Sequence, residues 1–236
     1  MDNSDSNSTP RTCKLTLLRI ELKDLERRKV DKICVNDYEL DTLSIVANAD
    51  ISAAMSIKNS KIKQIRITGD KRLKLNSLEI NGSCIDDGLK YLFKLDLQNL
   101  DINRSKLSEI ILKNKCNLNV RITDSSTEIL DISKSDIRLS EITNVRVNKL
   151  TVYDSLLRIT EQTFEQLLKA SEWHNIQNIR IKPLYFNSFR SGLITYRIGE
   201  ILHKVKLVLN KKRILSRYSN ILNNTSEQNT ITLVLK

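Results

Sequence analysis

The side chains best placed to do chemistry are the cations of one segment near the C-terminal end. Residues 178–217 contain ten Lys and Arg but a single acid, Glu200, whereas the chain before position 178 contains 28 basic and 26 acidic side chains. Tyr and Phe are interspersed in the same segment, and cations together with rings can neutralise phosphates and stack on bases. The predicted nucleic-acid contacts are Lys182, Arg190, Arg197, Lys204, Lys211, Lys212, Arg213 and Arg217.

The same segment also allows a purely structural interpretation. Residues 211–213 could begin a solvated helix, and the rings could belong to the core. The abundance of Ile, Asn and Lys is also what an AT-rich genome produces, so the basic character does not by itself require an acidic partner.

Groups suited to catalysis are few and far apart. His174 and His203 have no serine, cysteine or carboxylate at a spacing that suggests a proton relay. Asp86 and Asp87 flank Gly88 and have the composition of a turn. The four cysteines form no Cys-x-x-Cys motif, so neither a zinc site nor a redox pair is indicated. We therefore expect a protein that is not an enzyme and that needs no metal or cofactor.

Targeting signals are also not indicated. The chain has no apolar window of about 18 residues, and its first residues are acidic and polar where a signal sequence would be basic and then apolar. We expect an intracellular protein, cytoplasmic or nuclear, without a membrane span and monomeric by itself.

The elements that must position these residues follow from a phrase that recurs from Leu40 almost to the C-terminus. It consists of two apolar residues one apart, with an apolar residue or Thr three positions earlier. Each pair lies on one face of a short strand, and that face is buried only if another copy stacks on it. The copies are Leu40/Leu43/Ile45, Ile62/Ile65/Ile67, Leu75/Leu78/Ile80, Leu92/Leu95/Leu97, Leu107/Ile110/Leu112, Thr127/Leu130/Ile132, Ile142/Val145/Val147, Ile176/Ile179/Ile181, Leu202/Val205/Leu207 and a partial Leu233/Leu235.

The intervals between copies indicate what connects them. The first seven copies, which begin between Leu40 and Ile142, follow one another closely and leave little room for helices. We therefore predict strand-rich degenerate repeats over residues 40–160. The shortest interval, from Ile62 to Leu75, is too short for a complete coil. Either one phrase is an intervening strand of the same coil or the register is irregular there.

The ends of the chain differ from this middle part. Residues 1–12 lack core formers and are expected to form a disordered tail, and residues 13–39 an N-terminal cap, either helical or extended. Residues 161–236 are predicted to alternate helices with strands and to end in a C-terminal cap. One expected helix starts at Thr163 and ends near Trp173, and two others cover 194–205 and 214–222; the expected strands are 178–181, 207–209 and 231–235.

These phrases resemble leucine-rich repeats, whose pattern is LxxLxLxxNxL. The first six positions fit throughout, and Asn48 and Asn210 hold the asparagine position. The resemblance implies an α/β repeat solenoid of stacked short parallel strands, with a strand- and loop-rich first half and strand–helix units in the C-terminal third. A right-handed β-helix, built on similar parallel strands, is the structural alternative.

In such a solenoid, the residue between the two apolar ones points to the open concave side. The predicted partner-binding residues are Arg66, Glu79, Asp96, Asp131, Arg146, Arg180 and Lys206. The leading hypothesis is a non-enzymatic scaffold that binds a macromolecular partner, most simply a protein, through this face. The alternative is an RNA- or ribosome-associated factor that uses the basic C-terminal third.

Overall fold

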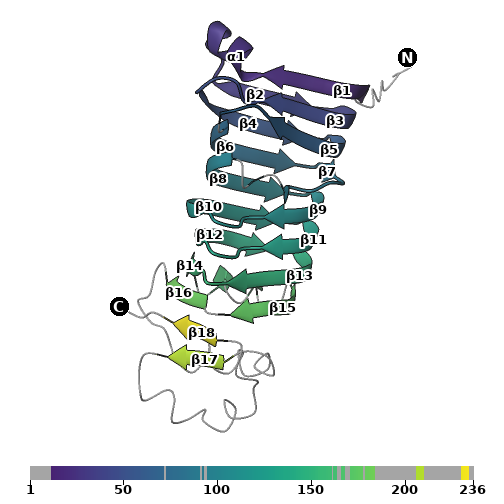
Figure 1. Cartoon of the computed structure of the whole chain (residues 1–236). Helices are drawn as coiled ribbons and strands as arrows, with labels where there is room; N and C mark the ends of the chain where they lie inside the picture. The colour runs from purple at the N-terminus through teal and green to yellow at the C-terminus, as the bar shows by residue number, and fades with distance from the viewer. Residues whose placement is uncertain are drawn as a thin grey trace, which may run out of the picture.

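The chain is wound into a solenoid in which parallel strands stack on one another in two sheets (Figure 1). The structure is a computed structural model that describes residues 12–71, 73–90, 92, 95–160, 162–163, 166–167, 171–177, 179–183, 206–209 and 230–233. Sheet A has eight strands in the order β1-β3-β5-β7-β9-β11-β13-β15. Sheet B has ten, in the order β2-β4-β6-β8-β10-β12-β14-β16-β18-β17.

The two sheets take alternate strands of the chain up to β16. Sheet A contains β1 (Cys13–Glu21), β3 (Tyr38–Val46), β5 (Lys61–Thr68), β7 (Cys84–Ile85), β9 (Lys106–Ile111), β11 (Ser126–Asp131), β13 (Arg146–Tyr153) and β15 (Ser171–Gln177). Sheet B contains β2 (Lys32–Asn36), β4 (Ser52–Lys58), β6 (Leu73–Asn81), β8 (Leu95–Asn103), β10 (Cys116–Thr123), β12 (Asp136–Thr143), β14 (Leu156–Ile159), β16 (Ile179–Pro183), β17 (Lys206–Leu209) and β18 (Thr230–Leu233).

Each coil therefore contributes one strand to each sheet, and this explains the uneven spacing of the apolar phrase. Ile62 lies in β5 of sheet A and Leu75 in β6 of sheet B, so the shortest interval joins two strands of the same coil. The register of sheet A aligns Lys61 with Cys84, Cys84 with Lys106 and Lys106 with Ser126. The first of the two alternatives for the shortest interval is confirmed.

The core lies between the two sheets and consists almost entirely of Ile, Leu and Val. Leu95, Leu97, Ile110 and Leu112 are all buried, as expected from their place in the phrase. They are not neighbours in one sheet, because β8 belongs to sheet B and β9 to sheet A. A repeated inward position thus fills the core from both sides.

The corners between β-strands are made by residues in the left-handed region followed by a buried serine. Asn59, Arg104 and Asp124 have φ of 49°, 47° and 49°, and each precedes such a serine. Asn and Asp tolerate this conformation better than other residues with a side chain. Gly82, with φ of 59°, holds the equivalent corner between β6 and β7. Asparagine, aspartate and serine thus turn a chain that has few glycines.

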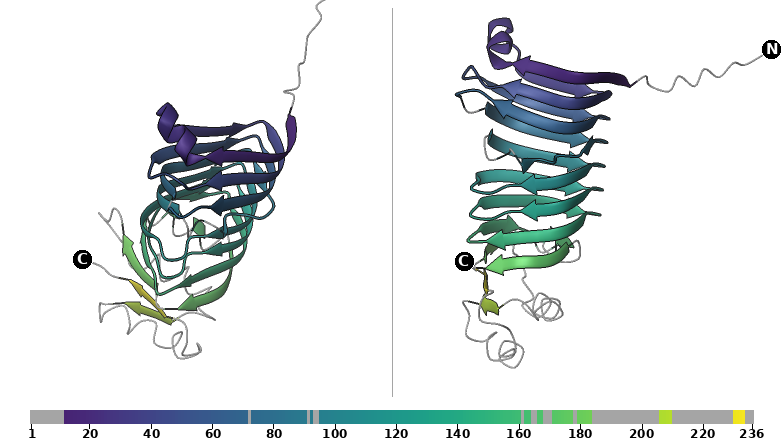
Figure 2. Two further views of the ribbon diagram at one scale, coloured as in Figure 1. Left: turned by 45° about the horizontal axis from the view of Figure 1, so that its top comes forward. Right: turned by 45° about the vertical axis from the view of Figure 1, so that its right-hand side comes forward.

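The N-terminal segment uses both of the conformations that its pattern allows. Residues 13–21 form β1, and α1 (Leu22–Arg28) begins directly after it, with Leu22 buried completely. Figure 2 shows α1 standing at the end of the stack beside β1. Because β1 is an edge strand, Leu15 remains 37% exposed although it aligns with the buried Leu40. Leu17, which aligns with Thr42, is 54% exposed. The disordered tail was predicted for residues 1–12, of which 1–11 lie outside the described residues.

The C-terminal third departs from the expected alternation of helices and strands. Residues 162–163 and 166–167 are helical, as expected for the helix that starts at Thr163. Its predicted end, Trp173, lies instead in β15, where it pairs with Leu150 of β13. The open edge of β13 offers hydrogen bonds to a neighbouring strand, and such tertiary pairing overrides a local helical pattern. Strands β16, β17 and β18 overlap the three strands predicted there. The helices predicted over 194–205 and 214–222 lie outside the described residues.

The architecture is a β-solenoid of two parallel sheets, and a right-handed β-helix, the alternative from the sequence, fits it. The resemblance to leucine-rich repeats extends to the stacked parallel strands, but strand–helix units are not supported. Among the described residues, no helix has the length and apolarity needed to cross a membrane.

Candidate functional site

A shallow groove of about 740 Å³ runs along the edge where the chain passes from sheet B to sheet A. We call it the edge groove. At its centre, three coils each contribute a left-handed corner residue, a buried serine and the first residue of a sheet A strand. These residues are Asn59, Ser60, Lys61, Gly82, Ser83, Cys84, Arg104, Ser105 and Lys106.

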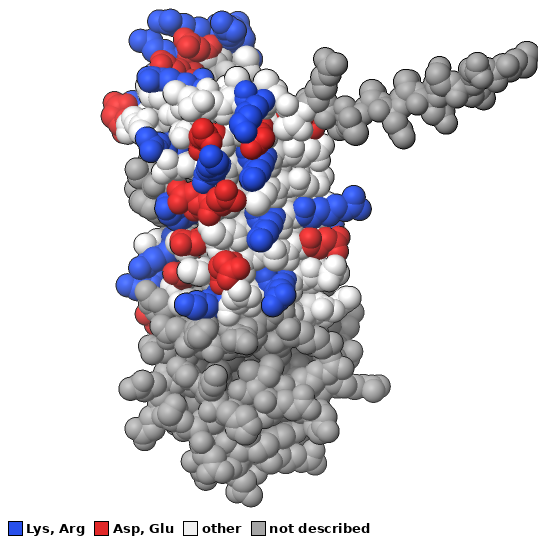
Figure 3. All heavy atoms as spheres, turned by 90° about the vertical axis from the view of Figure 1, so that its right-hand side faces the viewer, with Lys and Arg blue, Asp and Glu red and all other residues white. Residues whose placement is uncertain are grey.

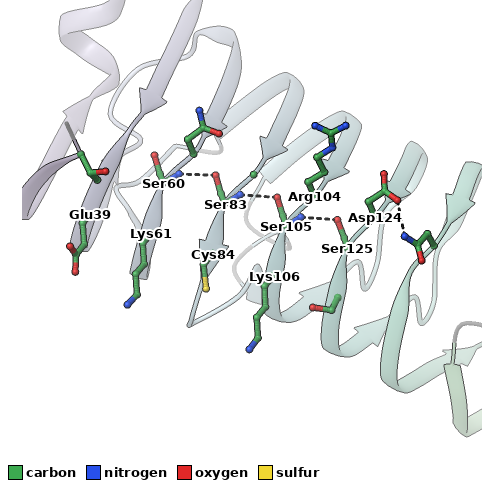
Figure 4. A pocket seen from close by; sticks show the side chains of 15 residues that line it. Glu39, Ser60, Lys61, Ser83, Cys84, Arg104, Ser105, Lys106, Asp124 and Ser125 are labelled. Atoms are coloured by element: carbon green, nitrogen blue, oxygen red, sulfur yellow. Dashed lines mark hydrogen bonds between the residues drawn. The ribbon is translucent and has the colours of Figure 1, made fainter. Parts of the chain in front are cut away.

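The serines form the middle row of the edge groove and bond one coil to the next. The Ser60 amide donates to Ser83 Oγ at 3.1 Å, the Ser83 amide to Ser105 Oγ at 3.1 Å, and the Ser105 amide to Ser125 Oγ at 3.0 Å (Figure 4). Each hydroxyl in turn donates to a carbonyl, as Ser105 Oγ does to Asn103 O at 2.7 Å. These buried hydroxyls are therefore occupied by the fold itself.

The backbone amides along the edge groove are also used within the stack. The Gly82 amide donates to Asn103 O at 3.0 Å, and the Arg104 amide to Thr123 O at 3.1 Å. On the other side of the serines, the amides of Cys84 and Lys106 each donate to a serine carbonyl at 2.9 Å. A ligand in the edge groove would therefore be held by side chains and not by backbone amides.

The side chains that flank the serine row are mainly cationic at the centre. Lys61, Cys84 and Lys106 point to one side of this row and Arg104 to the other (Figure 4). Within the described part of the chain, none of the three cations has a carboxylate within ion-pair distance. Burial is the main cause of the raised pKa of the Cys84 thiol, with a further contribution from its hydrogen bond to Asp86, so this side chain is neutral near pH 7.

Acidic side chains lie toward the two ends of the edge groove. Glu39 is at the N-terminal end, where Lys14 Nζ lies 3.5 Å from its carboxylate. Asp124 is at the C-terminal end and accepts a hydrogen bond from Asn144 Nδ2 at 2.9 Å. The edge groove thus has a positive centre and negative ends.

The partner-binding residues predicted from the sequence do not lie in one row. The structure distributes them over both sheets, because copies of the apolar phrase from which they were predicted lie in strands of both sheets. Arg66, Asp131 and Arg146 are in sheet A, and Glu79, Asp96, Arg180 and Lys206 are in sheet B.

Some of these residues already take part in contacts within the solenoid. Glu79 forms a 2.8 Å ion pair with Lys58 and accepts a hydrogen bond from Ser56 Oγ at 3.2 Å, and the hydrogen bond from Lys58 is the main cause of its lowered pKa. Asp131 accepts a hydrogen bond from the Ser133 amide at 2.9 Å. In contrast, Arg66, Asp96 and Arg146 are exposed and accessible to a partner.

A second polar feature lies on the outer face of sheet B. Arg121 of β10 lies 3.3 Å from Asp101 of β8 and 2.8 Å from Glu141 of β12, so one guanidinium joins three coils. The hydrogen bond from Arg121 is the main cause of the lowered pKa of Glu141. Because these charges satisfy one another, we assign them to the fold and not to a ligand.

Of the predicted nucleic-acid contacts, only Lys182 lies in a described element, β16. Arg190, Arg197, Lys204, Lys211, Lys212, Arg213 and Arg217 lie outside the described residues. On the side of the solenoid where the strands of sheet A begin, Lys and Arg alternate with Asp and Glu and form no large area of one sign (Figure 3).

The sequence analysis missed the edge groove, although the sequence contains a signal for it. Four successive corners at this edge repeat a left-handed residue followed by serine: Asn59-Ser60, Gly82-Ser83, Arg104-Ser105 and Asp124-Ser125. The serines are separated by 23, 22 and 20 residues, which is the length of a coil. The apolar phrase does not follow this period, because its copies fall on strands of either sheet.

Among the residues that the structure describes, no three His, Cys, Asp or Glu side chains are grouped so as to hold a metal ion. Comparison of the chain with protein-family models, with curated proteins and with solved structures finds no match.

Proposed function

We propose that the chain is a non-enzymatic intracellular scaffold that binds an extended segment of a partner protein along the edge groove. The observation that carries this proposal is the groove itself. Its lining residues begin five neighbouring strands of sheet A, β3 to β11. Four strand spacings amount to about 19 Å, which an extended chain covers with about six residues.

The charge distribution supports a protein partner for this part of the molecule. Nucleic-acid surfaces concentrate Lys and Arg on one face, because each phosphate contact requires a cation. The chain before position 178 holds 28 basic and 26 acidic side chains, and the groove side of the solenoid mixes both signs (Figure 3). Mixed charges provide specificity for a protein surface.

The basic segment supports a second candidate function. Ten cations against one acid in residues 178–217 favour an RNA- or ribosome-associated factor, for which the solenoid carries the basic C-terminal third. The two functions differ in their response to salt, because affinity based on phosphate contacts falls steeply with salt concentration.

The test uses the immobilised full-length chain, native lysate with and without nuclease, and three charge-reversal variants. Lys61→Glu/Lys106→Glu changes the edge groove, Arg66→Glu/Arg146→Glu the outer face of sheet A, and Lys211→Glu/Lys212→Glu/Arg213→Glu the basic segment. Circular dichroism establishes that each variant keeps its fold.

The proposal expects that nuclease-resistant protein is captured and that the groove variant alone loses it. Loss with the sheet A variant alone would instead identify the outer face predicted from the sequence. The RNA-associated function would be identified if nuclease abolished the capture of the partner and if only the basic-segment variant failed to capture it.

A further inference from the structure

Resting on the proposed function, we infer that the partner segment that occupies the edge groove is acidic and lies lengthwise across three coils. The central coils provide Lys61, Arg104 and Lys106 and no carboxylate among the groove-lining residues. Other lysines on the neighbouring surface have an acid close by, for example Lys58 with Glu79 at 2.8 Å and Lys63 with Asp41 at 2.6 Å. The groove cations are therefore available to an external anion.

The spacing of these cations matches an extended polypeptide. Lys61 and Lys106 begin β5 and β9, which are separated by β7 alone. This places their backbones two strand spacings apart, about 9.6 Å. In a segment extended as polyproline II, the side chains of residues i and i+3 point to the same side and are about 9.3 Å apart. Two acidic side chains at that spacing would each reach one lysine. Arg104, on the other side of the serine row, would bind a third acidic side chain.

The edge groove suits carboxylates better than nucleic acid. Single-stranded nucleic acid is held by aromatic stacking together with cations, and none of the groove-lining residues is aromatic. The amides of Gly82, Cys84, Arg104 and Lys106 all donate within the stack, so they cannot form the backbone cradle that binds phosphate. Glu39 and Asp124 at the two ends would repel a continuous phosphate backbone, whereas an acidic stretch of about six residues fits between them.

The chemistry of the neighbouring positions is consistent with this occupant. Gly82 has no side chain, and this leaves room for the side chain of Asn59, whose Oδ1 would lie only 2.7 Å from a Cβ at position 82. The side-chain amide of Asn59 donates one hydrogen to Asp37 Oδ1 at 3.3 Å and has a second hydrogen for a carbonyl of the bound segment. Cys84 itself is neutral, and the carboxylate nearest to it is that of Asp86, which does not line the edge groove and accepts a hydrogen bond from the Cys84 thiol at 3.5 Å.

The inference is tested by fluorescence anisotropy with two labelled peptides of about ten residues. One has Asp at every third position among Ser and Thr, and the other has Asn in place of each Asp. A single-stranded RNA of similar length is the third probe. Binding is measured to the full-length wild type, to Lys61→Glu/Lys106→Glu and to the matched control Lys74→Glu/Lys149→Glu. The control makes the same change in net charge on exposed residues of the outer sheet faces.

We expect the Asp peptide to bind wild type and the control, the groove variant to bind it at least about tenfold more weakly, and the Asn peptide not to bind. Equal binding to both variants, no binding of the Asp peptide, or groove-dependent binding of RNA alone would overturn the inference. If the Asp peptide fails while the groove variant still loses its captured protein, the proposed function stands and only the acidic character of the segment is wrong.

Discussion

At the scale of single residues, the hydroxyls of the buried corner serines take the place of backbone carbonyls as hydrogen-bond acceptors between coils. Each hydroxyl accepts from the amide of the serine in the preceding coil and donates to a carbonyl beside it. A corner residue in the left-handed region turns the chain away from the sheet ladder, and the following serine reconnects the two coils. The same device recurs at the opposite edge, where the Ser135 amide donates to Ser155 Oγ at 3.3 Å.

We predict that Ser105→Ala destabilises the protein by about 1 to 3 kcal/mol, because it leaves the buried Ser83 amide without an acceptor. Urea denaturation measures the effect. The control is Ser52→Ala, which removes an exposed hydroxyl that donates to Asn76 Oδ1 and should cost less than about 0.5 kcal/mol. Equal costs for the two variants would contradict a structural role for the serine row.

Acid should weaken the ion pairs on sheet B. The hydrogen bond from Arg121 lowers the pKa of Glu141 below its ordinary value of 4.5, so the unfolded state binds the proton more readily. This pair therefore contributes stability above that ordinary value and loses it as the pH falls through the lowered pKa. We expect wild-type stability to decline below about pH 5 and Glu141→Gln to decline less over the same range. Urea titrations at several pH values, with the exposed Asp96→Asn as control, measure the difference.

At the scale of elements, a strand inside the stack differs from a strand at its end. The interior strand β8 pairs with β6 and β10, and its inward leucines are buried. The edge strand β1 pairs with β3 alone, so its leucines remain partly exposed although Leu15 and Leu18 align with the buried Leu40 and Leu43. Helix α1 buries Leu22 and so covers part of this end.

The two strands provide a buried and an exposed leucine for comparison, Leu97 in β8 and Leu17 in β1. Leu97→Ala in β8 should cost about 2 to 5 kcal/mol, because it leaves a cavity between the sheets. Leu17→Ala in β1 should cost less than about 0.5 kcal/mol, because that side chain is 54% exposed. Chemical denaturation measures both. Similar costs would show that the end of the solenoid is more deeply buried than the structure indicates.

At the scale of the whole molecule, the solenoid is a one-dimensional stack in which each coil contacts only its neighbours. Lys106 and Ser126 occupy the same place in successive coils, as the register of β9 with β11 shows. Ser105 and Ser125 likewise hold equivalent corners. Because each coil begins and ends at equivalent positions, the removal of one complete coil should leave the strand register of the remaining coils unchanged.

We predict that the protein still folds when residues 106–125, one complete coil, are deleted. The slope of its unfolding free energy against urea concentration should decrease in proportion to the lost length, because less surface is exposed on unfolding. Deletion of residues 106–115 removes β9 but keeps β10, so every later strand would be shifted to the wrong sheet and the protein should not fold. Circular dichroism, size-exclusion chromatography and urea denaturation compare the two deletions. The coil architecture would be contradicted if the shorter deletion were tolerated as well as the longer one.

The sequence by itself determined that parallel strands stack into a solenoid. Apolar pairs such as Leu95/Leu97 must be buried on one face of a strand, and only neighbouring copies can bury them. The sequence also placed three C-terminal strands close to where they lie. These features depend on local pattern, so they can be inferred without knowing which strands meet.

Only the tertiary structure decided how the copies are assigned to sheets. The phrase at Ile62 and the phrase at Leu75 look alike, because a strand of either sheet needs the same inward residues. A single concave row from Arg66 to Lys206 was therefore inferred where two sheets exist. The edge groove was missed for the same reason, since Lys61, Arg104 and Lys106 come together only when successive coils are stacked in register. Pairing between distant segments selects that register, and local pattern contains no information on it.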